Sequence, residues 1–268
     1  MEINLDPNVF QLGPLLITWH GFFSAVGLAI GLWITARLVR GSTMTGDDVY
    51  TVAMAAVPGG IVGARLLFVL ENWHLFADRP LGVFAINEGG ISIYGAVIGG
   101  SIAGAILARR MRFPVAFLAD RSAIGLIVGE AIGRIGDIIN GEHHGREAFG
   151  LPWSVTYTHP GTLAEPRVPV HLAVAYEMLW DLVMGGLLYL LLRRQPLHGM
   201  TYVAYLFVYS LGRFWTGFFR KDTIVLPASP TGDIGLGMAQ TIAVLLMLIS
   251  IPWFFSLLQR GRAMSPLP

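Results

Sequence analysis

The 268-residue chain contains no cysteine and few charged residues. Without cysteine it forms no disulfide and supplies no thiolate of its own. Charged residues make up 13% of the chain, against about 25% in a typical soluble domain, so the polar surface is too small for a soluble globular fold. The net charge of +1 and the lack of a clustered basic face give no reason to expect a nucleic-acid partner.

Motifs for several kinds of chemistry are also missing. The sequence has no Walker-type phosphate loop, no Gly-x-Ser-x-Gly elbow and no dinucleotide fingerprint, so no cofactor is expected. His143 and His144 are adjacent, which makes their side chains diverge, and no spaced set of His, Asp or Glu accompanies them. We therefore expect no metal site.

Apolar sequence, in contrast, is abundant, because hydrophobic residues make up 54% of the chain. A bilayer core of about 30 Å is crossed by around 20 apolar residues in a helix. The sequence therefore predicts an all-α integral membrane protein, a bundle of seven transmembrane helices that forms a single polytopic domain over residues 1–268. The predicted spans lie near residues 15–38, 49–70, 90–108, 115–139, 171–192, 199–219 and 234–258.

Basic residues are distributed unevenly between the two ends of these spans. Nine Arg residues follow the first, third, fifth and seventh spans, whereas five Lys and Arg residues lie in the loops at the opposite ends. On the positive-inside rule this bias places the N-terminus outside and the C-terminus in the cytoplasm. The longer loops, 71–89, 140–170 and 220–233, then face outward.

The fourth predicted span ends in charged residues that a bilayer does not accommodate without a partner. On a helix Glu130, Arg134 and Asp137 fall at positions i, i+4 and i+7 and share one face, and Asn140 and Glu142 follow. These residues either form a structural ladder of ion pairs between helices or make a polar site for a ligand.

Arg213 in the sixth predicted span lies at about the depth of Arg134 in this topology. Two guanidiniums at one depth favour a phosphate between them, because the guanidinium fork presents paired donors in a plane. A phosphate at this depth belongs to a phospholipid headgroup. The alternative is that Arg213 pairs with Glu130, Asp137 or Glu177 and has only a structural role.

Other polar residues occur near the same level of the predicted bundle. Arg65 is either a third phosphate ligand or part of a structural pair. Tyr94 is either an interfacial anchor or a functional phenol, and His20 is either a structural hydrogen-bonding group or a proton-transfer group. Arg220 and Lys221 are expected to extend to the outer headgroups.

Several of these residues form motifs that resemble those of the bacterial prolipoprotein diacylglyceryl transferase family. The family signature Gly-Arg-x-Gly-Asn-Phe-x-Asn-x-Glu-x-x-Gly is similar to Gly133-Arg134-Ile-Gly136-Asp137-Ile-Ile-Asn140-Gly141-Glu142-His-His-Gly145. Similar stretches in the same order are Trp19-His20-Gly21, the glycine-rich run from Gly89 to Gly95, the His171 to Glu177 stretch, and Arg213 to Arg220. The likeness covers nearly the whole chain.

The resemblance implies transfer of the diacylglyceryl group of phosphatidylglycerol to the lipobox cysteine thiol in the signal peptide of a prolipoprotein. The products are a thioether and glycerol 1-phosphate. It also implies a bacterial cytoplasmic (inner) membrane protein in contact with membrane lipids, with its active site toward the outer face. The alternatives from other classes are another phospholipid-headgroup enzyme and an anion or proton transporter.

The chain departs from the family pattern at informative positions. His20 stands where many members have Tyr, Tyr94 where many have His, Asp137 replaces the first Asn of the signature, and Gly217 replaces a Glu. The group that deprotonates the thiol is therefore either Tyr94 or His20. The expected catalytic residues are Tyr94, His20, Arg134, Arg213 and Glu142, and the expected headgroup-binding residues are Arg134, Arg213, Asp137, Asn140, Glu142, Gly95, Gly145 and Arg65.

Overall fold

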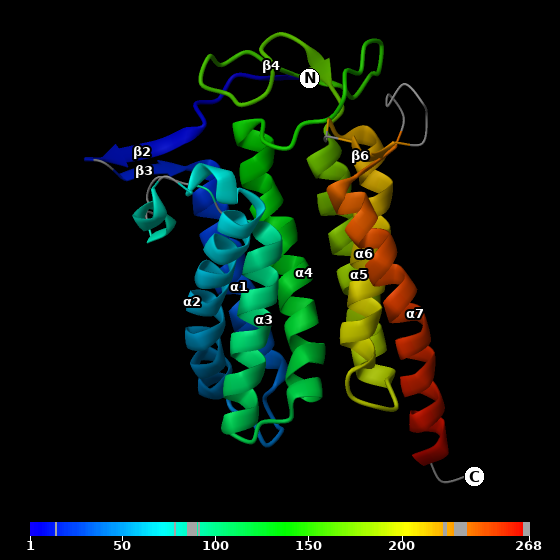
Figure 1. The fold of residues 1–268 in the computed structure, drawn as a ribbon. Helices are drawn as coiled ribbons and strands as arrows, with labels where there is room; N and C mark the ends of the chain where they lie inside the picture. The colour runs from blue at the N-terminus through cyan, green and yellow to red at the C-terminus, as the bar shows by residue number, and fades with distance from the viewer. Residues whose placement is uncertain are drawn as a thin grey trace. The chain divides into compact units, whose positions relative to one another are not determined.

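The computed structural model describes residues 1–13, 15–77, 79–84, 90, 92–221, 224–227 and 235–264. This part of the chain is mostly helical, and an α-helix occupies each of the seven ranges that the hydrophobic runs predict (Figure 1). The helices are α1 (Trp19–Leu38), α2 (Gly46–Glu71), α3 (Ile93–Arg110), α4 (Val115–Asn140), α5 (Ala173–Arg194), α6 (Met200–Thr216) and α7 (Met238–Met264).

Four helices in the described residues, α1, α2, α5 and α7, are long and apolar enough to cross a membrane. Helix α6 is only 17 residues long, and α4 interrupts its apolar sequence with charged side chains such as Glu130 and Arg134. The protein is therefore an α-helical membrane protein in which polar groups are concentrated on particular helices.

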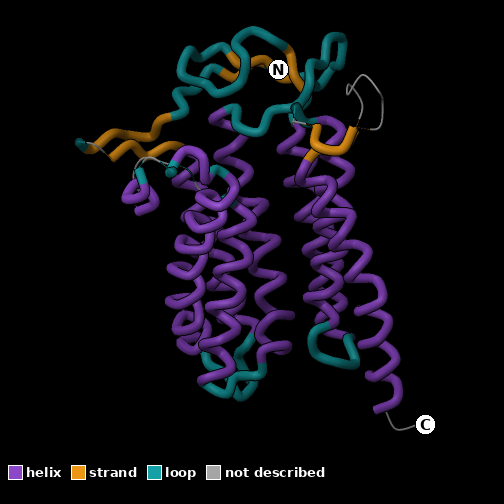
Figure 2. Tube along the Cα trace, in the orientation of Figure 1, coloured by secondary structure: helices purple, strands orange, loops and turns teal. Residues whose placement is uncertain are grey.

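Strands replace the ends of some predicted spans. Residues 15–18 of the first predicted span form β3 (Leu15–Thr18), which pairs antiparallel with β2 (Asn8–Leu12) through a turn at Gly13, where φ is +58°. A short apolar run does not distinguish a strand from a helix, and the β-branched Ile17 and Thr18 favour the strand. The seventh helix is likewise preceded by β7 (Gly235–Gly237), paired with β6 (Ile224–Pro227) and drawn in orange in Figure 2.

The chain divides into two compact units. The smaller unit, Thr35–Leu118, contains α2 and α3 together with the short 3-10 helices η1 (Trp73–Leu75) and η2 (Pro80–Phe84). Helix α2 begins at a capping box in which Thr45 accepts from the backbone of Asp48 and the Asp48 carboxylate accepts from the backbone of Thr45. Glycines then bring α2 and α3 into backbone contact, since Gly63 faces Gly95 and Gly99 with no room for a side chain.

The larger unit, Met1–Ile34 with Ala119–Pro268, contains most of α1, most of α4 and all of α5, α6 and α7. Glycines again determine the approach of α1 to α4. A Cβ on Gly129 would lie 2.6 Å from the carbonyl oxygen of Gly27, and one on Gly31 would lie 2.5 Å from that of Gly125. On the other side of the unit α6 packs against both α5 and α7. There Gly212 faces the Trp180 ring, whose Nε1 donates to the Val208 carbonyl over 2.9 Å.

The segment that connects α4 to α5 folds into a small sheet. Strand β4 (Val155–Tyr157) lies between β1 (Glu2–Ile3) and β5 (Pro169–Val170), and Val155, Tyr157, Ala164 and Val170 form its buried core. Gly141, with φ of +71°, ends α4 in the left-handed conformation. The backbone of Leu163 and the hydroxyl of Thr162 both donate to the last carbonyl of α4, that of Asn140.

At the other end of α4 a buried carboxylate organises the start of α6. Asp120, which is fully buried, accepts from the backbone of Gly199 (2.7 Å) and Tyr202 (2.9 Å) and from Nε2 of Gln195 (2.7 Å). A negative charge at a helix N-terminus satisfies free N–H groups and complements the helix dipole. This contact joins α4 to α6 at the end away from the charged cluster on α4.

Replacing Gly99 with alanine tests the glycine contact between α2 and α3. Its added methyl would lie 2.8 Å from Cα of Gly63, and we expect Gly99→Ala to lower stability by about 1–3 kcal/mol because the backbone itself must move. Gly186→Ala is the matched control, since Gly186 has open space around its Cβ direction; alanine there should be neutral or stabilise by up to about 1 kcal/mol. Thermal unfolding in detergent micelles compares the two, and equal Tm values would contradict the packing argument.

Candidate active site

The charged face of α4 folds as its spacing predicts. Arg134 lies between two carboxylates one helical turn on either side, donating from Nη2 to Glu130 Oε1 over 2.7 Å and from Nη1 to Asp137 Oδ2 over 3.0 Å. Asp137 is buried, and only 14% of the Arg134 side chain is exposed. Within the described residues the Arg134 Nε group is buried and donates no hydrogen bond.

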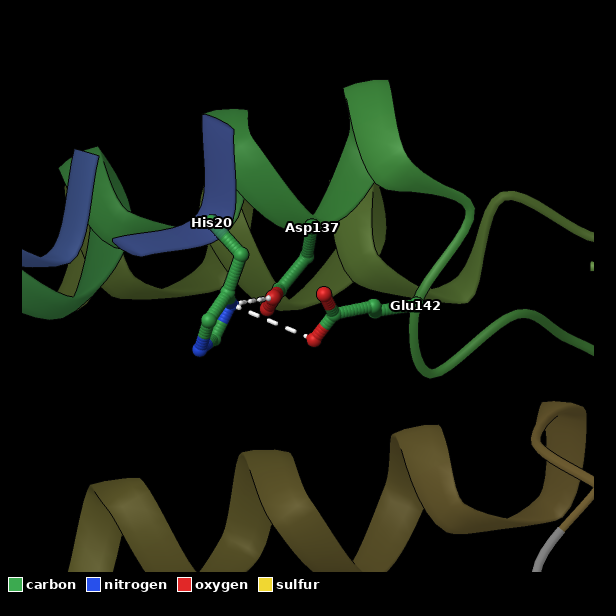
Figure 3. Close-up of side chains that lie close together, drawn as sticks. All are labelled: His20, Asp137 and Glu142. Atoms are coloured by element: carbon green, nitrogen blue, oxygen red, sulfur yellow. Dashed lines mark hydrogen bonds and ion pairs between the residues drawn. The ribbon is translucent and has the colours of Figure 1, made fainter. Parts of the chain in front are cut away.

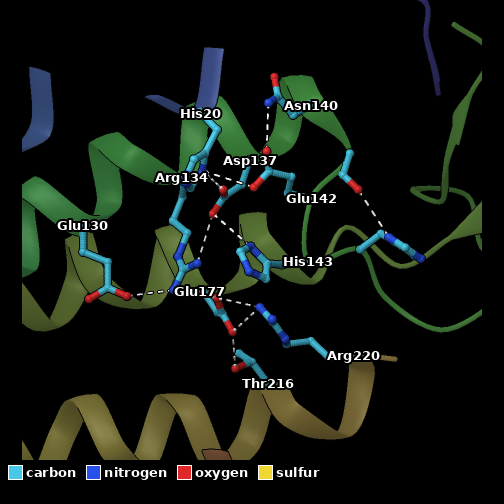
Figure 4. A network of polar contacts seen from close by, with 12 residues as sticks. His20, Glu130, Arg134, Asp137, Asn140, Glu142, His143, Glu177, Thr216 and Arg220 are labelled. Atoms are coloured by element: carbon cyan, nitrogen blue, oxygen red, sulfur yellow. Dashed lines mark hydrogen bonds and ion pairs between the residues drawn. The ribbon is translucent and has the colours of Figure 1, made fainter. Parts of the chain in front are cut away.

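A second helix brings a carboxylate that several arginines share. Glu177, on the first turns of α5, lies with its Oε2 3.1 Å from Arg134 Nη2 and with its Oε1 3.2 Å from Arg213 Nη1 and 3.4 Å from Arg220 Nη1. The hydroxyl of Thr216 donates to the same carboxylate over 3.0 Å. Glu177 thus joins α4, α5 and the end of α6, as Figure 4 shows for Arg134, Thr216 and Arg220.

Arg213 lies near Arg134, because both contact the same carboxylate of Glu177. It forms an ion pair with Glu177, one of the three carboxylates expected for a structural ion pair. The prediction for Arg220 was wrong, because its side chain is only 6% exposed and turns inward to Glu177. The Arg220 guanidinium turns inward because its attraction to a buried carboxylate is stronger, at low dielectric, than its interaction with water. Lys221 does point outward, with 60% of its side chain exposed beside Glu165.

A second cluster forms where α1 meets the end of α4. The ring nitrogen Nδ1 of His20 lies 2.5 Å from Asp137 Oδ1 and 3.4 Å from Glu142 Oε2 (Figure 3). Asn140 donates from Nδ2 to Glu142 Oε1 over 2.9 Å, and its own buried Oδ1 accepts no hydrogen bond from the described residues. Asp137, Asn140 and Glu142 are therefore brought together with His20, as the candidate site requires.

The two adjacent histidines diverge as expected. His143, with φ of +53°, turns its Nδ1 to within 3.6 Å of Asp137 Oδ2. The Nδ1 of His144 lies instead 3.2 Å from the carbonyl of Gly141. Asp137 therefore has an imidazole near each of its oxygens and the guanidinium of Arg134 on one of them.

The donor atoms of His20, Asp137 and Glu142 lie within 4.8 Å of one another, close enough for a divalent cation to be considered. In the structure His20 Nδ1 and Asp137 Oδ1 are instead hydrogen-bonded directly to each other. Arg134 already balances the charge of Asp137. Hydrogen bonds thus join the side chains of this cluster in the structure.

A small cavity lies between α4, α5 and α6 beside the Glu177 network. Both predicted phosphate ligands, Arg134 and Arg213, line it together with Glu130, Glu177, Asp181 and Tyr209. The Tyr209 hydroxyl donates to Glu130 Oε1 over 3.2 Å. Ionisable groups thus continue from the His20 cluster into the interior of the larger unit.

Three predicted residues belong to the smaller unit. Arg65 donates to the carbonyls of Gly82 (2.6 Å), Val83 (2.8 Å) and Gly90 (2.8 Å), and so binds the loop between α2 and α3. Gly95 packs against Gly63. Tyr94 lies in the first turn of α3, but its side chain is outside the described residues.

Gly145, in contrast, lies in the larger unit between two chain segments. A Cβ there would lie 2.5 Å from the carbonyl oxygen of His171 and 2.7 Å from that of Phe219. Its own N–H donates to the His171 carbonyl over 3.0 Å. The glycine thus lets the α4 to α5 segment pass between the start of α5 and the end of α6.

Sequence reasoning missed the central position of Glu177 and the contributions of His143 and Tyr209. The available signal for Glu177 was its place in an apolar helix two turns from the expected membrane boundary, which requires a cationic partner. No comparable signal distinguishes Tyr209 from its neighbours Tyr202 and Tyr205, because the residue that accepts its hydrogen bond comes from another helix.

The fold and the site define the protein as a helical membrane protein with a buried arginine–carboxylate cluster and a partly exposed histidine–aspartate pair. The model of one protein family, prolipoprotein diacylglyceryl transferase, matches residues 7–256. A relative from Dehalococcoides mccartyi, named phosphatidylglycerol–prolipoprotein diacylglyceryl transferase, is 34% identical over 97% of both chains. Relatives with the same name from Geobacillus kaustophilus (35% identical, 92% of this chain and 90% of the relative) and Clostridioides difficile (32%, 90% and 91%) are also similar. The chain belongs to the prolipoprotein diacylglyceryl transferase family.

Membership of this family makes the protein a transferase of lipoprotein biosynthesis. The resemblance that the sequence motifs carry is thereby confirmed over most of the chain. His20 and Asp137, two of the positions at which the motifs differ from the expected family pattern, meet in the cluster of Figure 3.

Tyr157 provides a measurable tether between the small sheet and α4. Its hydroxyl donates to the carbonyl of Ile138 over 2.8 Å. Burial, with a contribution from the charge of Asp137, raises the pKa of Tyr157 to about 12. Because the folded pKa lies above the unfolded value of about 10, the tether's contribution is complete below about pH 10 and is lost as pH rises toward 12.

We expect Tyr157→Phe to lower stability by about 0.5–1.5 kcal/mol at neutral pH, since one hydrogen bond is lost. The difference between the two proteins should shrink from pH 10 to pH 12 as Tyr157 ionises. Parallel thermal unfolding in micelles across this range measures the difference. A difference that stays constant to pH 12 would show that this phenol does not contribute in its protonated form.

Proposed function

We propose that the chain transfers the diacylglyceryl group of phosphatidylglycerol to the cysteine thiol of a prolipoprotein lipobox, releasing glycerol 1-phosphate. The observation that carries the proposal is the convergence of Arg134, Arg213 and Arg220 on one buried carboxylate, beside the cluster of His20 and Asp137. The arginines are suited to binding a phosphate, and the His20–Asp137 pair is suited to accepting a proton. The reaction needs both.

Within this proposal the chain is a single polytopic domain of the bacterial inner membrane, with seven spans and an external N-terminus. The site residues support this arrangement. His20 lies in the first turn of α1, Asp137 in the last turn of α4, Glu177 within the first two turns of α5, and Thr216 at the end of α6. If the helices cross in alternating directions from an external N-terminus, all four of these helix ends lie on the outer side, where the basic residues are fewest.

The guanidiniums bind the phosphate diester and the phosphate that leaves. Each already faces Glu177, so the ion pairs hold the planar forks in place before the lipid arrives. A headgroup phosphate would compete with this carboxylate for the Nη groups, while the unused Nε of Arg134 offers a further donor. As the carbon–oxygen bond breaks, negative charge grows on the phosphate, and fixed cations in a site of low dielectric stabilise it.

The remaining predicted residues receive supporting roles. Asn140 and Glu142, hydrogen-bonded to each other, orient the glycerol hydroxyls of the headgroup. Gly145 lets the chain segments above the site approach closely. In the smaller unit Arg65 shapes the α2 to α3 loop through three carbonyls. The thiol, with a pKa of about 8.5, requires a proton acceptor, which is His20 or Tyr94.

A transfer assay with purified protein tests this function. Phosphatidylglycerol in mixed micelles is offered with a lipobox peptide that carries Cys or Ser, and mass spectrometry follows both glycerol phosphate and the lipidated peptide. We expect release to require the Cys peptide. Arg134→Lys and Arg213→Lys should each lower the rate by about 10²–10³-fold, because the fork geometry is lost.

Arg167→Lys is the matched control, because Arg167 is exposed in the turn between β4 and β5; its rate should be that of the wild type. Glycerol phosphate release without a thiol would indicate a headgroup hydrolase. No release from a folded protein would instead favour transport.

The absence of cysteine makes the proposed topology easy to test. We expect Glu165→Cys, at an exposed position between α4 and α5, to react with a membrane-impermeant maleimide in right-side-out vesicles. Thr43→Cys, in the exposed turn between α1 and α2, should react only after the membrane is opened. The reverse labelling pattern would invert the orientation.

A further inference from the structure

We propose that His20 is the proton acceptor for the thiol, acting through Nε2, and that Asp137 positions its ring. This assignment rests on the proposed transferase function and chooses between the two acceptors that the sequence allows. It adds a positioning role for Asp137, which the sequence assigned only to the headgroup.

The contact geometry assigns the two ring nitrogens different roles. Nδ1 lies 2.5 Å from Asp137 Oδ1, so this nitrogen carries the proton that it donates to the carboxylate. Nε2 then has a free lone pair. In Figure 3 the second ring nitrogen points away from both Asp137 and Glu142, and 40% of the His20 side chain is exposed, whereas only 3% of the Asp137 side chain is. An acceptor that a substrate can reach is thus held by a buried carboxylate, the arrangement of a His–Asp pair in nucleophilic catalysis.

The charges around the ring favour a protonated imidazole during the reaction. Asp137 and Glu142 both face Nδ1. Arg134 opposes the positive charge but binds the other oxygen of Asp137, and His143 lies 3.6 Å from that same oxygen. Two carboxylates therefore stabilise the imidazolium directly, while the nearest cation acts on it through Asp137.

The backbone places His20 against α4 and keeps it there. A Cβ on Gly136 would lie 2.6 Å from Cα of His20, so only glycine permits this approach. The residue before His20 is fixed from the other side, since Trp19 donates from its backbone to Pro7 and from its ring to the carbonyl of Asp6. Position 20 is therefore set by packing of the chain on both sides.

The proton and electron balance is simple. The thiol proton passes to Nε2 as sulfur forms its bond to the glyceryl carbon. The carbon–oxygen bond breaks, and its electron pair remains on the phosphate of the leaving glycerol phosphate. The imidazolium then returns its proton to that phosphate or to water. A neutral imidazole accepts a proton directly on its free ring nitrogen, whereas a phenol with an ordinary pKa of about 10 must first ionise to accept a proton.

The charge of residue 137 matters as well as its hydrogen bond. An Asn at position 137 could accept the same hydrogen bond but would carry no charge to stabilise the imidazolium. The direct contact between His20 and Asp137 is therefore the arrangement that a His–Asp acceptor requires.

A comparison of thiol and selenol acceptors tests the assignment. A selenol is ionised at neutral pH and needs no base, so a lipobox peptide with selenocysteine in place of cysteine bypasses the proton acceptor. His20→Asn keeps a donor near the position of Nδ1 but has no second ring nitrogen. We expect it to slow transfer to the cysteine peptide by about 10²–10⁴-fold, the usual contribution of general base catalysis, and to slow transfer to the selenocysteine peptide by less than about tenfold.

Asp137→Asn should also slow transfer to the cysteine peptide more than transfer to the selenocysteine peptide. The loss of rate on the cysteine peptide should be smaller than in His20→Asn. His144→Gln is the matched control from the same turn, and its rates on both peptides should be those of the wild type. Circular dichroism and Tm in micelles confirm that each variant is folded.

Equal loss on both peptides in His20→Asn would overturn the proposal, because it would mean that His20 supports the structure or binds the lipid. A Tyr94→Phe enzyme that loses activity only on the thiol, while His20→Asn does not, would assign the acceptor to Tyr94. A wild-type protein that uses neither peptide would instead contradict the transferase function itself.

Discussion

The burial of Glu177 is the constraint on which the rest of the site depends. An isolated ionised carboxylate in an apolar helix bundle is strongly unfavourable, so α5 can occupy its place only if cations reach it. They come from α4, from α6 and from the residue that follows the 3-10 turn after α6. Removing one partner from such a group typically costs about 3–5 kcal/mol, because the charge that remains is uncompensated. The same requirement that joins these elements also concentrates guanidiniums at one level.

Glycine determines the other half of the site. Helices that pack in a membrane gain little from burying apolar surface and depend on close contact. Along α4 the glycines facing α1 remove every side chain that would separate the two backbones, and Gly136 does so beside His20 itself. The contact that stabilises the helix pair is thus the contact that aligns the imidazole with Asp137. The close packing of α1 on α4 therefore also fixes where the backbone of His20 lies relative to Asp137.

The sequence predicts contacts within a single helix well. The shared face of Glu130, Arg134 and Asp137 follows from helix periodicity, and the structure confirms it because both ion pairs form within one helix. The central place of Glu177 and the inward turn of Arg220 depend on three elements meeting, and the spacing of residues within one helix carries no such information. Arg65 illustrates the same limit, because its backbone partners are 17 to 25 residues away along the chain. Strand β3 was missed for a different reason, since four apolar residues fit a strand as well as a helix.

The proposed reaction links the arginine–Glu177 cluster to the His20–Asp137 cluster, because charge moves from one to the other. In the two clusters together four carboxylates outnumber three guanidiniums. Glu130, Asp137 and Glu177 face Arg134, Arg213 and Arg220, and Glu142 faces His20. An anionic headgroup would increase that excess, and a proton lost to water would increase it again as the thiolate formed. If His20 keeps the thiol proton, the total charge of the site stays constant while negative charge moves from sulfur to phosphate. The enzyme then has only to redistribute charge between an imidazolium at one end and guanidiniums at the other, and Asp137, which contacts both His20 and Arg134, lies between them.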